Sequence, residues 1–411
     1  MGSLRLIHTS DWHLGKKLGT HSRLKEQIQV LKRLVEMVKT HQAHAVLVAG
    51  DVFDSPNPPA EAEALFEEIT AELTEEGQRP VICIAGNHDS PERIDARRTW
   101  GSRQGILMIG TLEGTIPSRL GRAELLDLGN GLVEIHHPDW SIPLRLLLSP
   151  YFSPYRMPSA DQSFVDWLQQ SWKKALESAP VSSADTPTVM LTHAYVGLDS
   201  YVPELEEDPE EKSLKIGGAQ IIPLGAFPKG LSYVALGHIH RAKVFEGDFL
   251  IGYSGSPLQY SFDDLEREKG VLLIELQAEN EIKVFHQKIA LFDDSSMKPL
   301  LFQKRVTSYK EAQEAVIYYQ DHFLKLIWGG PKALSPEEIS WLKDRHERLF
   351  IEEGIFTREA LLHDSQAPQE SRFFSLEEAF RAYYIQTNKG KEPSDLLMEV
   401  FREVLRKAQS A

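Results

Sequence analysis

The sequence predicts an α/β fold built on two β-sheets. Within the first 110 residues, short apolar runs typical of buried strands alternate with amphipathic stretches of helical period. A second series of strand-like runs follows residue 106. Short motifs of Asp, Asn and His also stand where several predicted strands end, which is where ligands bind in α/β sheets.

The first 110 residues show the clearest alternation. Strands are predicted over 4–9, 45–50 and 81–86, and helices over 22–41, over 60–76 and from Pro91 onward. The strands AVLVAG and VICIAG are continuous apolar runs, as expected for strands that are buried on both faces. Strands that alternate with helices in this way indicate a layered domain with βαβ units.

The next 180 residues predict mainly strands. Strand-like runs occur at 132–137, 144–150, 188–193, 233–238, 249–257 and 271–276, with an amphipathic stretch at 163–177. We expect these strands to form the second sheet, and the alternating run IKVFHQ at 282–287 to close the domain. The acidic block ELEEDPEE at 204–211 has no apolar face and predicts a solvated loop.

The chain is predicted to divide into four parts. Residues 1–287 form the α/β domain, and residues 288–362 form a smaller, mainly helical domain rich in aromatic residues. Residues 363–374 have the composition of a linker. Residues 375–411 predict a pair of amphipathic helices, the first of which opens with the capping box SLEE.

Composition excludes several classes of protein. The hydrophobic share of 42% excludes wholesale disorder, and the net charge of −15 argues against a protein that coats nucleic acid. The only cysteine, Cys83, lies in an apolar run, which excludes disulfides within the chain and cysteine redox chemistry. Because no stretch reaches the roughly 18 apolar residues of a spanning helix, we expect a soluble, cytoplasmic protein.

Five motifs contain the residues that could bind metals or take part in catalysis. They are DWH (Asp11, His13), GDVFD (Asp51, Asp54), GNHD (Asn87, His88, Asp89), THA (His193) and GHIH (His238, His240). Each follows a predicted strand, so residues far apart in the sequence are expected to meet at the carboxyl ends of the strands. Any one motif alone is more often a hydrogen-bonded structural group, but composition predicts Gly-His-x-His only roughly 0.04 times in this chain.

Together these motifs predict a dinuclear metal centre. Carboxylates, imidazoles and one amide suit Mn, Zn or Fe, and the lack of cysteine ligands argues against a structural zinc cluster. A phosphate ester is the natural substrate, because two divalent ions can bind its oxygens and activate a water molecule. Glycines before Asp51, Asn87 and His238 allow the backbone to approach the ions closely.

The ordered set D-x-H, G-D-x-x-D, G-N-H-D, H and G-H-x-H resembles the signature of the calcineurin-like metallophosphoesterase family. The flanks HTSDWHLG, VAGDVFDSPNPP, AGNHDSPER, LGHIHRA and YSGSPLQYSFDD look like the SbcD family, the nuclease subunits of bacterial SbcCD complexes. The resemblance is strong over residues 4–110 and 188–275 and thin between them. It implies a four-layer sandwich of two β-sheets flanked by helices.

The resemblance also implies roles for individual residues. One ion, usually manganese, would be held by Asp11, His13, Asp51 and His240, and the other by Asp51, Asn87, His193 and His238. Asp51 would bridge the two ions. His88 would contact the scissile phosphate and protonate the leaving oxygen, and Asp89 would orient His88. We treat Asp54 as a hydrogen-bonding support, and we note that the flank LTHAYVG of His193 departs from the form common in the family.

The activity implied by the resemblance is metal-dependent cleavage of DNA, both exonucleolytic and endonucleolytic. Lys16, Arg93 and Arg241 follow the metal motifs and are the predicted DNA contacts. A small-molecule or cyclic-nucleotide phosphodiesterase on the same dinuclear core is the alternative. A structural subunit whose metal site has decayed is a third possibility, which the full ligand set disfavours.

The resemblance finally implies partners. Members of the family form homodimers through helices near the active site, for which 61–76 and 91–104 are the candidates. Residues 288–362 correspond in position to a cap that guides DNA. The helix pair within 375–411 is similar in position and pattern to the segment that binds the coiled coil of SbcC, an ABC-type ATPase.

Overall fold

The computed structural model describes most of the chain. The described residues are 2–157, 162–180, 186–197, 221–265, 268–279, 281–291, 301–353, 393–394, 397–398 and 401–402. Two compact units are present, one comprising Met1–Ile327 with Leu334–Glu352 and the other Trp328–Ala333 with Glu353–Ala411. The first unit contains both large sheets and every residue of the predicted site.

The first sheet contains six strands in the order β18-β17-β1-β4-β5-β6. Their bounds are β1 Gly2–Thr9, β4 Ala45–Val48, β5 Val81–Ile84, β6 Ile106–Ile109, β17 Gly270–Ala278 and β18 Ile282–Ala290. Strands β1, β4, β5 and β6 run parallel. They are connected by α1 (Leu24–Thr40), α2 (Ala60–Thr74), α3 (Pro91–Ala96) and α4 (Arg98–Gln104). The predicted βαβ units are therefore confirmed.

The second sheet contains eight strands in the order β15-β16-β14-β11-β10-β9-β8-β7. Their bounds are β7 Arg119–Leu120, β8 Ala123–Gly129, β9 Leu132–His136, β10 Leu144–Ser149, β11 Thr188–His193, β14 Tyr233–Gly237, β15 Lys243–Phe245 and β16 Leu250–Tyr253. Strands β10, β11, β14 and β16 are parallel, and α5 (Phe164–Ser178) lies between β10 and β11 in the chain.

One strand was predicted in the wrong sheet. The run VLLIEL at 271–276 belongs to β17, which pairs antiparallel with β1 in the first sheet rather than joining the second. The side chains explain the placement, because Val271 packs on the helix side of the first sheet and Leu272 packs between the sheets. An apolar run predicts a buried strand, but it does not reveal the neighbours of that strand.

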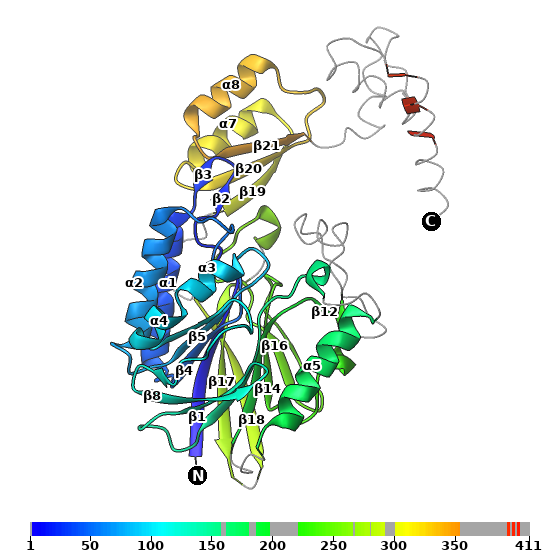
Figure 1. Cartoon of the computed structure of the whole chain (residues 1–411). Helices are drawn as coiled ribbons and strands as arrows, with labels where there is room; N and C mark the ends of the chain where they lie inside the picture. Colours follow the sequence, from blue (N-terminus) through cyan, green and yellow to red (C-terminus); the bar gives the residue numbers. More distant parts are fainter. Residues whose placement is uncertain are drawn as a thin grey trace. The chain divides into compact units, whose positions relative to one another are not determined.

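The first unit is built in four layers, with helices on the outer faces of the two sheets (Figure 1), and side chains that alternate along the strands pack between them. On β4, Val46 and Val48 pack in the cluster that contains α1 and α2, whereas Ala45 and Leu47 face the cluster between the two sheets. On the outer face of the second sheet, Trp172 and its neighbours on α5 cover strands β10, β11 and β14. The order helix, sheet, sheet, helix confirms the predicted sandwich, and Cys83 is buried as expected.

Short elements complete the first unit. They are β2 Lys17–Leu18, β3 His21–Ser22, β12 Val196–Gly197, β13 Ile222–Pro223, and the 3-10 turns η1 Pro154–Arg156, η2 Leu224–Ala226 and η3 Phe262–Asp264. Strands β2 and β3 form a small hairpin directly after the DWH motif. Turn η3 ends the YSGSPLQYSFDD segment, which returns the chain to β17.

The sequence predicts a mainly helical domain over 288–362, but the described residues 301–353 contain strands as well as helices. They form a three-stranded sheet of β19 (Leu301–Val306), β20 (Phe323–Trp328) and β21 (Leu349–Glu353), with α7 (Tyr309–Tyr318) and α8 (Pro336–Arg345). The aromatic residues Phe323 and Trp328 belong to β20, whose sequence FLKLIW buries alternate side chains toward its end. Aromatic residues favour strands, and six residues are too few for a helical period to be distinguished.

Several predictions fall outside the described residues. These are the acidic loop 204–211, the linker 363–374 and most of the helix pair 375–411, of which Leu397, Met398, Phe401 and Arg402 are described and helical. None of the helices in the described part of the chain combines the length and the hydropathy that crossing a bilayer requires.

Candidate metal centre

The predicted site residues converge at the carboxyl ends of five parallel strands. Loops after β1, β4 and β5 in the first sheet meet β11 and the loop after β14 in the second. Three groups of ligand atoms lie within 4.8 Å of one another: Asp11, His13 and His240; His13, Asp51 and His88; Asp11, Asp51 and His193. The convergence expected from the strand positions is thus present.

Backbone hydrogen bonds join the first two loops. The N–H groups of Asp11 and His13 donate to the carbonyl oxygens of Gly50 and Asp51, each at 3.0 Å. Asp11, His13, Asp51 and His238 have φ values of 55°, 44°, 49° and 101°, a region that side-chain-bearing residues rarely adopt. Strain of this kind persists at functional sites, where the surrounding structure holds it in place.

Glycine is required at two places for steric reasons. A Cβ atom on Gly86 would overlap the carboxylate of Asp51, and one on Gly237 would overlap the carbonyl oxygen of Ala49. The glycines of GNHD and GHIH therefore allow two loops to approach the loop that carries Asp51.

His13 and His240 form the first half of the centre. Their Nε2 atoms are 3.0 Å apart, and His13 Nε2 is 3.6 Å from Asp51 Oδ2. Two imidazole nitrogens at this separation can both ligate one ion at the usual distance of about 2.0–2.1 Å. Asp11 lies beside them, and its carboxylate accepts the backbone N–H of His238 at 3.0 Å.

Asn87, His193 and His238 form the second half. The side-chain oxygen of Asn87 is 2.9 Å from His193 Nε2 and 2.9 Å from His238 Nδ1. His193 Nε2 is also 3.4 Å from Asp51 Oδ2. The carboxylate of Asp51 thus lies between the two groups, where a bridging ligand is expected, and the donor set fits a pair of divalent ions.

Asp54 lies beside His13 in the first half of the centre, and Lys16 forms an ion pair with Asp54. Asp54 Oδ1 is 3.4 Å from His13 Nδ1 and accepts the ammonium of Lys16 at 3.1 Å. A carboxylate this close to the far nitrogen of a ligating imidazole favours a hydrogen on that nitrogen and leaves Nε2 available to an ion. Lys16, which the sequence suggested as a DNA contact, is buried in this arrangement.

The sequence predicts that Asp89 orients His88, but in the structure Asp89 contacts other groups. Its carboxylate accepts the backbone N–H groups of Val52, Phe53 and Gly86 at 3.1, 2.9 and 2.8 Å, so that it ties two loops together. His88 Nδ1 instead lies 3.0 Å from the backbone carbonyl oxygen of Asp54. A backbone carbonyl has no signature in the sequence, so no motif could have identified this partner.

Burial and the carboxylates determine the charges of the centre. Burial lowers the pKa of His193, but the carboxylate of Asp51 raises it further, to about 9. Burial and the charge of His193 lower the pKa of His238 to about 3. Burial and the carboxylate of Asp51 raise the pKa of Asp89 to about 6. Without an ion, the cluster therefore carries a proton on His193.

Metal binding should consequently release protons. His193 and His13 can ligate an ion only as neutral imidazoles, and in both residues carboxylates outweigh burial and raise the pKa, so the affinity should fall as the pH is lowered from 9. Calorimetric titration with Mn²⁺ at pH 7 and 8, in two buffers of different ionisation enthalpy, measures both the affinity and the protons released. Equal affinities at the two pH values would contradict this assignment of charge.

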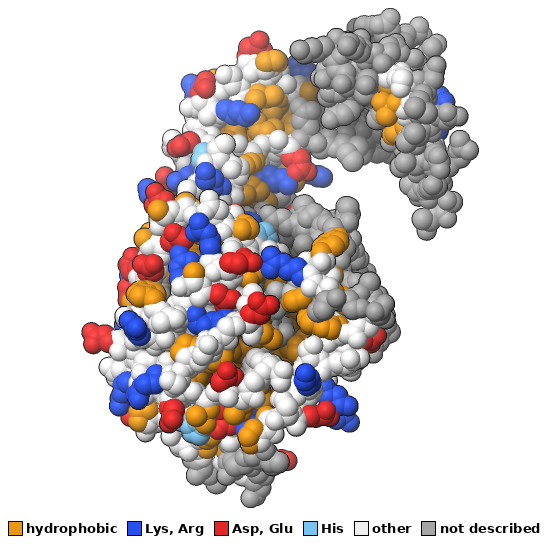
Figure 2. All heavy atoms as spheres, viewed as in Figure 1, with side chains coloured by type: hydrophobic (Ala, Val, Ile, Leu, Met, Phe, Trp, Pro, Cys, Tyr) orange, Lys and Arg blue, Asp and Glu red, His pale blue; other side chains and the backbone are white. Residues whose placement is uncertain are grey.

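The two other predicted DNA contacts, Arg93 and Arg241, are more exposed than Lys16. Arg93 is partly exposed, but its guanidinium bonds Glu63 at 3.1 Å and Asn57 at 2.8 Å. Arg241 follows His240 and is exposed. On the face shown in Figure 2, basic and acidic side chains are interspersed rather than gathered into one basic patch.

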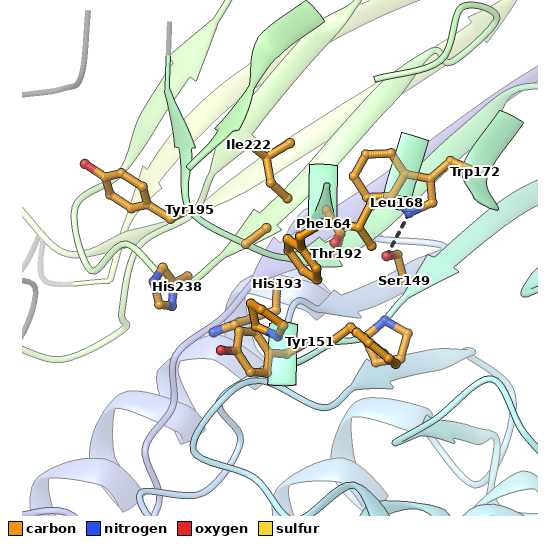
Figure 3. Close-up of a pocket in the computed structure, with 14 residues that line it drawn as sticks. Ser149, Tyr151, Phe164, Leu168, Trp172, Thr192, His193, Tyr195, Ile222 and His238 are labelled. Carbon is orange, nitrogen blue, oxygen red and sulfur yellow. Dashed lines mark hydrogen bonds between the residues drawn. The ribbon is translucent and has the colours of Figure 1, made fainter. Parts of the chain in front are cut away.

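A small cavity lies behind the second half of the centre (Figure 3). Its volume is about 40 Å³, and its lining is largely apolar apart from His193, His238 and a few hydroxyl groups. The rings of Tyr151 and Tyr195 stand edge to face with these two imidazoles, with centroids 6.2 Å apart in each case. Aromatic walls keep this side of the imidazoles in an apolar environment, which strengthens electrostatic interactions there.

Comparisons with known proteins identify the family of this chain. The calcineurin-like phosphoesterase family matches residues 4–242. The SbcD component of the nuclease SbcCD from Bacillus subtilis is 31% identical over 406 residues, which cover 98% of this chain and 97% of that protein. The protein of the same name from Rhodobacter capsulatus is 28% identical over 66% of each chain.

Among solved structures, GAP50 of Plasmodium, described as the anchor in the inner membrane complex, matches with a TM-score of 0.42 and 14% identity over 71% of this chain and 86% of that chain.

The family model matches more than half of this chain, and the Bacillus subtilis relative matches nearly all of it. This chain therefore belongs to the calcineurin-like phosphoesterase family and, within it, to the SbcD family.

Proposed function

We propose that this chain is a metal-dependent DNA nuclease, with both exonuclease and endonuclease activity, that works in an SbcCD-like ATP-dependent complex on DNA ends. The observation that carries the proposal is the assembly of all the predicted ligands around Asp51. The match with an SbcCD nuclease component over nearly the whole length supports DNA as the substrate. Manganese is the ion we propose.

The residues of the centre have distinct tasks in this proposal. Two bound divalent ions would supply a water nucleophile at neutral pH and neutralise charge on the phosphate. Asp11, His13 and His240 would hold one ion, Asn87, His193 and His238 the other, and Asp51 both. The burial of the carboxylates and imidazoles, and the hydrogen bonds of Asn87, keep the ligands in place before substrate binds.

His88 is the residue we assign to the leaving group. The carbonyl oxygen of Asp54 can only accept, so a hydrogen bond from His88 Nδ1 requires that this nitrogen carries a hydrogen. The neutral ring then has an unprotonated Nε2, and the charged ring can donate from Nε2. Charged His88 can therefore bind the phosphate and pass the Nε2 proton to the leaving oxygen.

The size of a groove beside the centre favours an extended substrate. It has a volume of about 1200 Å³, begins at Gly86 and Asn87, and continues along Tyr151, Phe152 and Trp167. Pockets for small molecules usually measure about 300–1000 Å³, so this groove exceeds the need of a small ester. Aromatic side chains along its wall can stack with nucleobases.

Two other functions are possible for the same centre, and the proposed partners follow from the sequence. A small-molecule or cyclic-nucleotide phosphodiesterase could use the same dinuclear core, but the groove and the full-length match favour DNA. The complete ligand set disfavours a decayed structural subunit. We also propose a homodimer formed through α2, α3 and α4, an SbcC-like ATPase bound by residues 375–411, and a cytoplasmic location.

Cleavage assays test the proposed function. End-labelled duplex and single-stranded DNA, beside bis-p-nitrophenyl phosphate, should be cut with Mn²⁺, and EDTA should abolish all cleavage. If the small ester alone is turned over, even after an SbcC-like ATPase is added, the phosphodiesterase alternative is correct. If neither substrate is cut with any divalent ion, the chain is not an enzyme of this class.

A further inference from the structure

A buried ammonium group contacts the backbone of one predicted ligand. Lys269 lies directly before β17 and is 3% exposed. Its Nζ donates to the carbonyl oxygen of His240 at 3.0 Å, to Ser256 Oγ at 2.9 Å and to Asp264 Oδ1 at 3.0 Å. An ammonium has three hydrogens to donate, so these three contacts fix its position.

Asp264 anchors the ammonium to the preceding segment. It is fully buried, and its second oxygen accepts the backbone N–H of Tyr260 at 3.1 Å. It also completes the capping box that begins turn η3 at Ser261. A buried ion pair adds little net stability compared with apolar residues of the same volume. The specific consequence of this pair is a fixed position for the backbone at His240.

A second side chain holds the backbone of the other histidine of the same half-site. Gln27 on α1 donates from Nε2 to the carbonyl oxygen of His13 at 2.7 Å and to the hydroxyl of Tyr260 at 3.1 Å. The hydroxyl of Tyr260 in turn bonds the carbonyl oxygen of Trp12. The segment 256–264 thus connects Gln27 and Lys269, and it links the loops that carry His13 and His240.

The second half of the centre is held by different contacts. His193 Nδ1 is 2.8 Å from the carbonyl oxygen of Ala49, and Asn87 contacts both His193 and His238. Neither Lys269 nor Gln27 takes part in these contacts, so a change at Lys269 should act first on the ion site of His13 and His240.

We propose that Lys269, paired with Asp264, is a positioning residue for the ion site formed by His13 and His240. The ammonium sets the position of the His240 backbone, and Gln27 sets that of His13, so that the two Nε2 atoms meet 3.0 Å apart. This inference rests on the dinuclear centre of the proposed function. It adds a supporting residue that contacts only the half of the centre formed by His13 and His240.

The test is a calorimetric titration of the whole chain with Mn²⁺ alone. Wild-type protein should bind two ions, and Lys269→Met should bind one ion with unchanged affinity and the other about 10- to 100-fold more weakly, as is usual when a residue that supports a metal ligand is lost. Lys283→Met is the matched control, because Lys283 is exposed on β18 and pairs with Glu279 at 2.7 Å. The control should bind both ions as wild type does.

A double variant covers the case in which Lys269→Met fails to fold. In Lys269→Met/Asp264→Asn no unpaired charge is buried, and the asparagine oxygen can still accept the N–H of Tyr260. Circular dichroism should show a folded chain, and the same single site should be weakened. Two unchanged sites, or equal weakening of both, would overturn this inference but would not contradict the proposed nuclease function. Failure of wild-type protein to bind two ions would overturn the dinuclear centre itself.

Discussion

Replacing Asp51 by asparagine should remove both ions from the centre and lower DNA cleavage by about 1000-fold or more, since the lost carboxylate would serve both metals. Asp51 Oδ2 lies 3.6 Å from His13 and 3.4 Å from His193, one imidazole from each half of the centre. The amide has nearly the same shape but no charge, so the change isolates the electrostatic role. Bound Mn²⁺ per chain, measured after dialysis, and the cleavage rate report the result.

The matched control for this variant is Asp139→Asn. Asp139 is exposed and pairs with Arg122 at 2.8 Å, far along the chain from any site motif. It should keep both ions and full activity. If Asp51→Asn protein still binds either ion with wild-type affinity, Asp51 is not the bridging ligand.

Replacing His88 by alanine should leave both ions bound and lower turnover by about 100- to 10,000-fold, the usual contribution of a general acid. The structure makes this a demanding test, because a ring nitrogen of His88 lies within 4.8 Å of ligand atoms of His13 and Asp51. His88 could reach an ion from there. Its hydrogen bond to the carbonyl of Asp54 and its partial exposure favour the phosphate instead.

Metal content and rate must therefore be measured together for His88→Ala. The control is His136→Ala, since His136 is exposed on β9 and pairs with Glu134 at 2.8 Å. Loss of one ion from His88→Ala would make His88 a ligand. An unchanged rate would remove it from the reaction.

Most of the fold and of the ligand set could be predicted because both depend on periodic or local features. Val46 and Leu47 face opposite layers because side chains alternate along a strand, and apolar runs such as AVLV reveal this directly. Asp11 and Asp51 follow parallel strands of the first sheet, and His193 ends a parallel strand of the second, so the carboxyl ends of these strands bring the three residues together.

The features that were mispredicted depend on contacts that a sequence does not display. The orientation of His88 depends on a backbone carbonyl, and the burial of Lys16 depends on Asp54, which lies in another loop. The strand that contains Leu272 gave no sign of its partner β1. In β20, six residues were too short for strand and helix periods to be separated.

Two ions should bind to this chain, one on each side of the Asp51 carboxylate. An anomalous-difference map from crystals grown with Mn²⁺ tests this expectation most directly, because it locates the ions without reference to activity. The account predicts two peaks on either side of the Asp51 carboxylate, one beside His13 and His240 and the other beside His193 and His238. A single peak, or peaks away from Asp51, would contradict it.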